Sequence, residues 1–392
     1  MHLDRAVRCP SHMPAPRLRV AIVVASLRIL GGQAVQAQRM IDGWRTDPAI
    51  DAWIVPVNPV PPPPIDRLLR MKYVRTLVTQ LWYWPLLFRE LRRADLVHIF
   101  SASYSSFLLA PLPAVVVARL LGKPILLNYH SGEAPDHLRR SWIARRILLR
   151  HVDLNVVPSP FLRGVLASFG IEAEVVHNTI DLREFSYRVR KPLAPRLLST
   201  RNFEPLYNVA CVLRAFARVQ AHHPDASLVL VGSGSQDAAL RSLASALKLR
   251  RVTFAGSVPP SQIARFYADA DLYVQSPSID NMPLSVLEAF ASGLPVVSTG
   301  VGGVPTILTH GVHGLLAPDD DDAALAAHVL HLLADPDEAR RMAAAAHESC
   351  LQYDWPAVRE GWLAAYRAVM RGGRAPRAAG TCSTSVEPQE SL

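Results

Sequence analysis

Residues 280–299 read DNMPLSVLEAFASGLPVVST and place a helix and a strand within one short stretch. Residues 284–292 are mostly apolar over a length that suits a buried helix. Residues 295–298 form the apolar, β-branched run expected of a strand that is buried on both faces of a parallel sheet. Because the helix and the strand follow each other so closely, this stretch predicts an α/β fold.

The same alternation of strands and helices extends outward from this stretch. Helices are expected between the strands, for example at residues 208–221 and 236–247. Strands separated by helices predict a parallel α/β sheet in each half of the chain. The expected strands are residues 18–25, 55–60, 95–100, 124–129, 154–157, 173–176, 196–199, 227–231, 252–254, 272–275, 295–298 and 314–317.

The length of the chain predicts two domains. It has 392 residues, and single hydrophobic cores stop growing at roughly 250–300 residues. Two α/β domains that face each other bind ligands beyond the carboxyl ends of their strands. The expected segments are a flexible N-terminus (1–16), an N-terminal domain (17–190), a C-terminal domain (191–354), a helix that packs back on the N-terminal domain (355–371) and a disordered tail (372–392).

The net charge of +9 is distributed unevenly along the chain. Residues 1–190 contain 25 Lys and Arg against 14 Asp and Glu, a net charge of +11. Residues 191–392 contain 17 against 19, a net charge of −2. A basic half beside a near-neutral half indicates an anionic surface or substrate on one side of the molecule. No nucleic-acid-binding motif accompanies the charge, so nucleic acid is not an expected partner.

The cysteines and the first residues predict a cytoplasmic protein. The four cysteines are far apart and form no CxxC pair, which fits a reducing compartment. Residues 1–19 are polar and interrupted by prolines, unlike a secretory leader. The apolar run at 20–27 is too short to cross a bilayer. The sparsely charged stretch 96–118 is expected to be a buried strand followed by a core helix.

Glycines gather at two of the expected strand ends. Gly31 and Gly32 follow the first strand, and Gly232 and Gly234 stand between a strand and a helix. Small residues at such a turn let a ligand approach the backbone and the N-terminus of the following helix. Tight turns favour glycine for many reasons, so each turn is a weak signal alone.

Together and in order, the motifs of this chain resemble the donor-site core of the family 4 glycosyltransferases of the GT-B fold. That family has an acidic residue, seven further residues and a glutamate that opens the run E-A-x-A-x-G-x-P-V-V. Here Asp280 is followed by seven residues, Glu288 and the run AFASGLPVV at 289–297. The resemblance covers roughly residues 18–335. Its further pieces are Gly31-Gly32, residues 158–162, residues 177–185, Arg201, Gly232, Gly234, residues 252–256 and Gly302-Gly303.

The resemblance implies two Rossmann-like parallel-sheet domains that face a cleft, and it gives roles to residues of that cleft. Arg201 would bind phosphate oxygens. Glu288 would accept two hydrogen bonds from a ribose, Asp280 would hold a hydroxyl of the donor sugar, and His130 would contact the donor sugar or the acceptor. The implied catalytic residues are His130, Asp280 and Arg201; the implied acceptor-binding residues are His130 and Glu133; the implied donor-binding residues are Gly31, Gly32, Arg201, Gly232, Gly234, Asp280, Asn281, Met282, Pro283, Leu284, Glu288, Gly302 and Gly303.

The implied function is that of a retaining glycosyltransferase of hexosyltransferase type. It would move a sugar from a nucleotide sugar to a lipid-linked or polysaccharide acceptor in cell-surface glycan biosynthesis. The family is metal-independent, so no metal or other cofactor is expected, and the acidic residues 319–322 are interpreted as the start of a helix. Two alternatives remain open: a GT-B-like binding or scaffold protein that has lost turnover, and a related GT-B nucleotide-sugar epimerase.

Three positions depart from the family pattern. Asp280 stands where the family usually has glutamate, and Thr306 where a glutamate often follows the Gly-Gly-x-Pro turn. A lysine normally follows the arginine by about six residues, but residues 201–208 read RNFEPLYN, with Tyr207 in this region. The loss of one cation would cost on the order of a few kcal/mol of leaving-group stabilisation. Because the other cleft residues are present, we expect an active enzyme of a divergent subgroup.

Two basic segments account for much of the positive charge of the first half. Residues 67–93 combine seven Lys and Arg with several aromatic and apolar residues. Basic helices with apolar side chains suit the interface of an anionic membrane, and a solvated arginine face over a buried apolar face is an equal alternative. We expect a cytoplasmic protein that associates peripherally with the inner face of the cytoplasmic membrane. The other segment, residues 138–150, has five arginines and no acidic residue: Arg139, Arg140, Arg145, Arg146 and Arg150.

Overall fold

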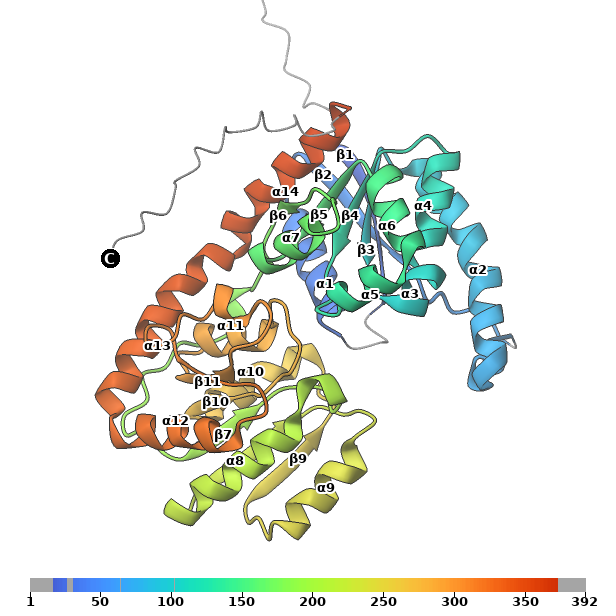
Figure 1. Cartoon of the computed structure of the whole chain (residues 1–392). Helices are drawn as coiled ribbons and strands as arrows, with labels where there is room; N and C mark the ends of the chain where they lie inside the picture. Colours follow the sequence, from blue (N-terminus) through green and yellow to red (C-terminus); the bar gives the residue numbers. More distant parts are fainter. Residues whose placement is uncertain (1–16, 27–30, 64, 102, 373–392) are drawn as a thin grey trace, which may run out of the picture.

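Two six-stranded parallel sheets form the core of the computed structural model (Figure 1). The structure describes residues 17–26, 31–63, 65–101 and 103–372. The N-terminus expected to be flexible (1–16) and all but the first residue of the tail expected to be disordered (372–392) lie outside these residues. Each sheet with its helices forms one domain, and the two domains confirm the predicted α/β class.

The N-terminal sheet has the strand order β2-β1-β3-β4-β5-β6. Neighbouring strands are parallel; Ile22, for example, lies opposite Ile54 on one side and His98 on the other. The strands are β1 (Leu18–Val24), β2 (Ile50–Pro56), β3 (Leu96–Ser101), β4 (Ile125–Tyr129), β5 (Leu154–Val157) and β6 (Glu174–Val175). The helices are α1 (Gly32–Trp44), α2 (Lys72–Arg93), α3 (Tyr104–Leu109), α4 (Pro111–Leu120), α5 (Ala134–Arg140), α6 (Trp142–Arg150) and α7 (Pro160–Ala167).

Strand β1 shows how the apolar sequence determines the layers of this domain. Ala21 and Val23 belong to the core under α2, α4, α5, α6 and α7. Val20 and Ile22 point to the opposite face, where they belong to the core under α1 and the last helix. Because successive side chains of a strand alternate between faces, a continuous apolar run is buried on both sides.

The C-terminal sheet has the order β12-β11-β10-β7-β8-β9. Adjacent residues again divide between two cores, since Leu197 packs under α8 and α12 and Leu198 under α10 and α11. The strands are β7 (Arg196–Ser199), β8 (Ser227–Val231), β9 (Val252–Gly256), β10 (Leu272–Val274), β11 (Val296–Thr299) and β12 (Leu315–Ala317). The helices are α8 (Val209–His222), α9 (Asp237–Ala246), α10 (Pro260–Asp269), α11 (Leu284–Ala291), α12 (Asp322–Ala334) and α13 (Pro336–Cys350).

The last helix, α14 (Trp355–Met370), leaves the C-terminal domain and lies along the N-terminal sheet (Figure 1). Trp362 and Tyr366 are buried in the same core as β1 and β3. The Tyr366 hydroxyl lies 2.9 Å from Nδ1 of His98 on β3. The first described strand, β1, and the last described helix, α14, therefore belong to the same domain. Short 3₁₀ helices complete the fold at η1 (Ile65–Arg70), η2 (Leu182–Glu184), η3 (Pro205–Tyr207), η4 (Val304–Thr306) and η5 (Leu351–Tyr353).

Two details of the expected secondary structure were wrong. The second strand is β2 at Ile50–Pro56 and not residues 55–60, because the prolines that follow from Pro59 onward have no backbone N–H to donate to a sheet. The apolar stretch after β3 forms two helices, α3 and α4, where a single helix was expected. Pro111 opens the second helix at its first residue, a position where its missing N–H costs nothing.

Candidate functional site

A cleft with a volume of about 1210 Å³ lies between the two domains, beyond the carboxyl ends of their strands. The loops after β1 and β4 form its N-terminal wall. The loops after β7 and β8 and the beginning of α11 form its C-terminal wall. The predicted site residues that line it are Gly31, Gly32, His130, Glu133, Arg201, Gly232, Asp280, Asn281, Met282, Pro283, Leu284 and Glu288.

Three predicted glycines do not line this cleft, and one of them, Gly302, lines an adjoining cavity. A side chain at Gly234 would collide with the backbone of Phe203, so this glycine lets two loops pack together. Gly302 has a φ of +54°, and a Cβ there would overlap the carbonyl oxygen of Asp280. The backbone N–H of Gly303 donates to that carbonyl at 3.1 Å. The turn at 302–303 therefore supports the loop that carries Asp280.

The backbone at Gly31 is open toward the cleft. A Cβ built on Gly31 would meet no heavy atom within 4 Å, and one on Gly32 would meet only Leu284 at 3.9 Å. Gly32 is also the first residue of α1. A ligand can therefore approach the first turn of this helix, where backbone N–H groups and the helix dipole favour negative charge.

Arg201 follows β7 and is the cation in the C-terminal wall of the cleft. Its side chain is 9% exposed, forms an ion pair with Asp280 and donates to Ser285 Oγ at 3.0 Å. Burial disfavours the charged guanidinium, but attraction by Asp280, together with smaller contributions from nearby tyrosines, leaves the pKa of Arg201 raised. Its Nε is buried without a hydrogen-bond partner among the described residues. The Nε–H of the guanidinium is thus available to a ligand.

Tyr207 contacts Arg201 and lies six residues after it, about where the family pattern has a lysine. The Arg201 guanidinium carbon lies 4.0 Å from the centre of the Tyr207 ring. Tyr207 also lines the cleft. A cation over an aromatic ring is held in place by about 0.5–2 kcal/mol. The aromatic ring therefore does not replace the missing charge, but it fixes the orientation of the arginine that remains.

Glu288 on α11 is buried and has a hydrogen-bond donor on each carboxylate oxygen. Arg39 of α1 donates to Oε1 at 3.1 Å, and the Tyr267 hydroxyl of α10 donates to Oε2 at 2.9 Å. Burial raises the pKa of Glu288, whereas the positive charge of Arg39 acts in the opposite direction. Each carboxylate oxygen accepts about two hydrogen bonds, so each retains an acceptor position for a ligand.

His130 follows β4 and faces the cleft from the N-terminal domain. Its ring lies 5.1 Å from that of Phe100, nearly parallel to it. Burial lowers the pKa of His130 to about 3, so the imidazole is neutral at physiological pH. Its Nε2 is a second buried atom without a partner in the described part of the chain. Glu133, in the same loop, lines both the cleft and an adjoining cavity of about 400 Å³.

Arg39, Ser285 and Tyr267 contact the predicted site residues but were not predicted from the sequence. Arg39 lies seven residues after Gly32 on α1, two helical turns along the same face. Since Gly32 was predicted to lie at the ligand site, this spacing would have indicated that Arg39 faces the same site. Ser285 lies next to Leu284 within the quoted motif, but nothing in the motif distinguishes it from its neighbours.

Alternative interpretations of the acidic and basic segments can be compared with the structure. Within the described ranges, no group of three or more His, Cys, Asp or Glu is arranged to hold a metal ion. Asp321 accepts the Ala324 N–H at the start of α12, as expected for an acidic helix start. Of the five arginines at 138–150, Arg140 pairs with Asp136, and Arg145 donates to backbone carbonyls. No helix of the described residues has the length and apolar character needed to span a membrane.

Comparisons with known proteins assign both halves of the chain. Residues 31–184 match the family described as Glycosyltransferase Family 4, and residues 188–349 match Glycosyl transferases group 1. Glycogen synthase of Mycobacterium tuberculosis is 28% identical over 68% of this chain and 68% of its own length. D-inositol 3-phosphate glycosyltransferase of Segniliparus rotundus is 34% identical over 67% of this chain and 62% of its own length.

The solved structures agree on the fold. The crystal structure of HepE from Anabaena in complex with UDP and glucose has a TM-score of 0.69 to this chain. It is 17% identical, over 90% of this chain and all of that chain. Its two facing domains have the GT-B arrangement that the sequence motifs implied. With matches in both domains and this fold, the chain belongs to the family 4 GT-B glycosyltransferases.

Proposed function

We propose that this glycosyltransferase moves a sugar, with retention of its anomeric configuration, from a nucleotide sugar to a lipid-linked or polysaccharide acceptor in cell-surface glycan biosynthesis. One observation carries the donor half of the proposal. Arg201 Nε and His130 Nε2 lie in opposite walls of one cleft, and both are buried without a partner among the described residues. An unpaired buried polar group costs about 1–3 kcal/mol, which a ligand that pairs with it removes.

The donor diphosphate binds between Arg201 and the backbone at Gly31, Gly32 and Gly232. In the reaction the bond between the anomeric carbon and the phosphate oxygen breaks, and its electron pair remains on the diphosphate. The charge of Arg201 and the backbone N–H groups stabilise this negative charge. A bond forms between the anomeric carbon and an acceptor hydroxyl oxygen on the same face of the sugar, and the hydroxyl proton passes to the departing diphosphate. Asp280 accepts a hydrogen bond from a hydroxyl of the sugar while it remains paired with Arg201. Glu288 accepts hydrogen bonds from the ribose.

We also propose that no metal or other cofactor takes part. The protein supplies positive charge from both walls, since Arg39, Arg75 and Arg201 are the Lys or Arg residues among the described residues that line the cleft. The solved HepE structure, which holds UDP and glucose, supports a nucleotide sugar as the donor class. The HepE structure makes UDP the first nucleotide to assay.

The acceptor is proposed to enter from the N-terminal side. The cleft continues past His130 to Arg75, Thr79 and Gln80 on α2. Three apolar side chains on this helix, Leu77, Leu81 and Trp84, are exposed by 64%, 59% and 37%. Their spacing of four and three residues places them on one face of the helix. An apolar face beside the acceptor end of the cleft suits an acceptor that is attached to a lipid.

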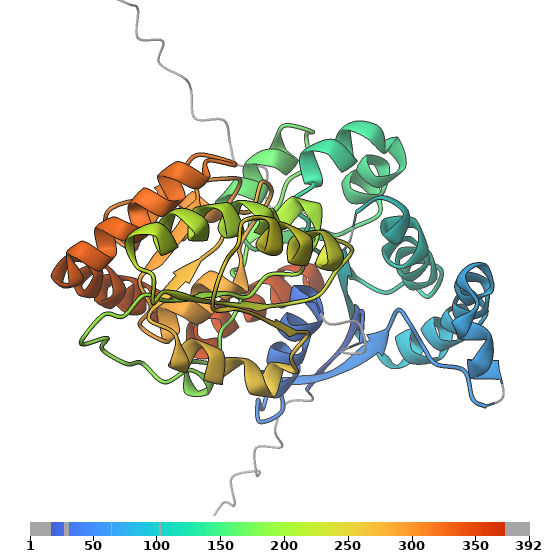
Figure 2. The same cartoon turned by 90° about the horizontal axis from the view of Figure 1, so that it is seen from below.

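The helical layer that contains α2 also carries exposed arginines. Arg139, Arg146 and Arg150 are exposed on α5 and α6, and Trp142 is 62% exposed beside them. Helices α2, α5 and α6 pack on the same face of the N-terminal sheet. In both views α2 lies along the outer edge of the N-terminal domain (Figures 1 and 2). We propose that this layer rests on the anionic inner face of the cytoplasmic membrane.

Turnover of nucleotide sugars by wild type and Arg201→Ala tests the function. We expect the wild type to release nucleoside diphosphate from a UDP-, GDP- or ADP-sugar, and the variant to lose at least about a hundredfold in kcat. Arg218→Ala, on α8 and paired with Asp322, is the matched control and should retain activity. No release from any donor would support a scaffold protein. Release of a rearranged sugar without an acceptor would support an epimerase.

A further inference from the structure

An arginine of the N-terminal domain holds the carboxylate of Glu288, which belongs to the C-terminal domain. Arg39 Nη2 lies 3.1 Å from Glu288 Oε1, and the two side chains are 10% and 11% exposed. A buried charge pair is costly to form, and removal of one partner leaves the other charge uncompensated. Attraction between two exposed charges therefore does not account for this buried ion pair.

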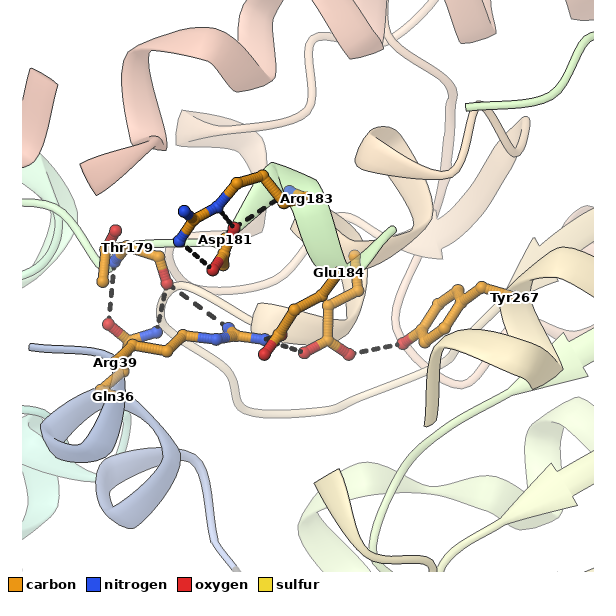
Figure 3. Close-up of polar contacts among 8 residues, drawn as sticks. Gln36, Arg39, Thr179, Asp181, Arg183, Glu184 and Tyr267 are labelled. Atoms are coloured by element: carbon orange, nitrogen blue, oxygen red, sulfur yellow. Dashed lines mark hydrogen bonds and ion pairs between the residues drawn. The ribbon is translucent and has the colours of Figure 1, made fainter. Parts of the chain in front are cut away.

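The position of Arg39 is fixed by the segment that joins the domains. Arg39 Nη1 donates to the Thr179 carbonyl at 3.4 Å, and Nη2 also contacts Glu184 at 3.3 Å. One helical turn earlier, the Gln36 amide donates to the Thr179 carbonyl at 2.7 Å and accepts from the Thr179 N–H at 2.8 Å. Figure 3 shows Gln36 and Arg39 side by side on α1, both reaching toward this segment.

The segment 178–184 in turn contacts the loop of the C-terminal wall that contains Met282. The Asn178 side-chain amide donates to the Met282 carbonyl at 3.1 Å. On the far side of Glu288, Tyr267 is fully buried and donates to the other carboxylate oxygen. Arg39 and Tyr267 thus hold the carboxylate from two sides, which fixes its rotation. Both Arg39 and Glu288 line the cleft.

We propose that Arg39 is a positioning residue that orients the Glu288 carboxylate for the two hydroxyls of the donor ribose. The inference rests on the proposed function, in which Glu288 binds this ribose. With one donor already on each oxygen, the remaining acceptor positions form a pair that suits a vicinal diol. Recognition of the nucleoside then depends on the seating of α1 against residues 178–184.

The test compares ribonucleotides with their 2′-deoxy counterparts. Binding of UDP, GDP, ADP, dUDP, dGDP and dADP is measured by calorimetry on the wild type, Arg39→Gln, Arg39→Lys and Glu288→Gln. Arg45→Gln is the matched control, because Arg45 directly follows the same helix, is 70% exposed and pairs with Asp42. For the preferred base, we expect the wild type and the control to bind the ribonucleotide at least about tenfold more tightly than the deoxynucleotide.

In Arg39→Gln this ratio is expected to fall to about threefold or less, with little change in binding of the deoxynucleotide. Glu288→Gln should show the same loss, and Arg39→Lys an intermediate ratio. An equal loss of affinity for both sugars in Arg39→Gln would overturn the inference, because it would indicate a purely structural role. Tighter binding with an unchanged ratio would overturn it as well, since Arg39 would then merely compete with the ligand.

The outcomes also distinguish this inference from the proposed function. If the wild type binds a nucleoside diphosphate but does not discriminate against the 2′-deoxy form, the inference is wrong and the donor proposal stands. If the wild type binds none of the six nucleotides, the donor proposal itself fails, and the positioning role fails with it.

Discussion

Arg201 has three partners in the cleft wall, and each restricts it differently. The Asp280 carboxylate neutralises it, Ser285 Oγ accepts one of its hydrogens, and the Tyr207 ring lies beneath its guanidinium plane. The buried Nε remains without a partner among the described residues. A planar guanidinium held in one orientation binds phosphate more selectively than a flexible ammonium group.

Substitution of Tyr207 tests whether its ring orients Arg201. Tyr207→Phe keeps the ring and should retain kcat/KM for the nucleotide sugar within about twofold. Tyr207→Leu removes the cation–π contact, so kcat/KM should fall by about threefold to thirtyfold. Steady-state kinetics on both variants provides the comparison. If the two substitutions reduce kcat/KM equally, the hydroxyl and not the ring is the important group.

Part of the site was predictable at the residue scale, and part was not. Asp280 and Glu288 have a fixed spacing in one motif, so their shared place in the cleft follows from local sequence. The pairing of Arg39 with Glu288 spans 249 residues, and no local pattern encodes it. Gly302 and Gly303 were predicted to bind the donor, and in the structure they also support the Asp280 loop. A tight turn under a loop and a turn beside a ligand require the same residue, so the sequence does not separate the two roles.

At the scale of elements, α14 joins the two domains through a buried polar contact. His98 on β3 has no exposed surface and lies between Phe100 and the aromatic rings of α14. Burial and, to a smaller degree, the charge of His130 lower the pKa of His98 to about 3. The imidazole is therefore neutral in the folded protein at any pH near neutrality.

This buried histidine predicts a loss of stability in acid. Above pH 6.5 the folded and unfolded chains are both unprotonated at His98, so it has no effect there. As the pH falls from 6.5 toward 3, only the unfolded chain gains the proton, which destabilises the fold by about 2 kcal/mol at pH 5. His98→Gln keeps a polar group near Tyr366 and removes the titration.

Thermal unfolding at pH 7.5 and pH 5.0 measures this difference. We expect the melting temperature of the wild type to decrease more between the two pH values than that of His98→Gln. Equal decreases in the two proteins would show that His98 is not the source of acid sensitivity.

The predictability of the elements follows from the same physics. Strands such as β5 and β7 occur where the sequence predicted them, because apolar runs buried on both faces leave few alternatives. Strand β2 was misplaced because Ile50–Pro56 contains the exposed Asp51 and several half-buried residues. Such a mixed strand has a weaker periodic signal than the apolar residues near its end.

At the scale of the whole molecule, the excess positive charge and most of the proposed donor-binding side chains lie in different halves of the chain. The N-terminal half carries the excess of positive charge, whereas the proposed donor site relies on Arg201, Glu288 and backbone groups. Of the described Lys and Arg residues of this half, only Arg39 and Arg75 line the cleft, so most of its positive charge lies away from the proposed donor site. It belongs instead to the helical layer of α2, α5 and α6, next to the acceptor end of the cleft.

Vesicle flotation at low salt tests the proposed membrane face. The wild type should float with vesicles that contain phosphatidylglycerol and not with neutral phosphatidylcholine vesicles. The triple variant Leu77→Gln, Leu81→Gln, Trp84→Gln should lose binding, since each buried apolar side chain contributes about 1.5–3 kcal/mol. Arg146→Gln with Arg150→Gln should weaken binding, mainly at low ionic strength.

Leu351→Gln is the control for this experiment, because Leu351 is an apolar residue of the C-terminal half that is 52% exposed. It should float like the wild type. If the wild type does not bind anionic vesicles at low salt, the membrane proposal is wrong. If the control loses binding as the triple variant does, the docking face is not specific to α2.

A thermal-shift panel of UDP, GDP and ADP is the most direct test of the nucleotide cleft. We predict that one of them stabilises the wild type by about 2.7 kcal/mol at a hundredfold excess over its Kd. Gly31→Leu should fold normally, because Gly31 is extended and a Cβ there meets no atom within 4 Å, but its side chain should obstruct the cleft and abolish the shift. No shift in the wild type, or an equal shift in Gly31→Leu, would contradict a nucleotide site between the domains.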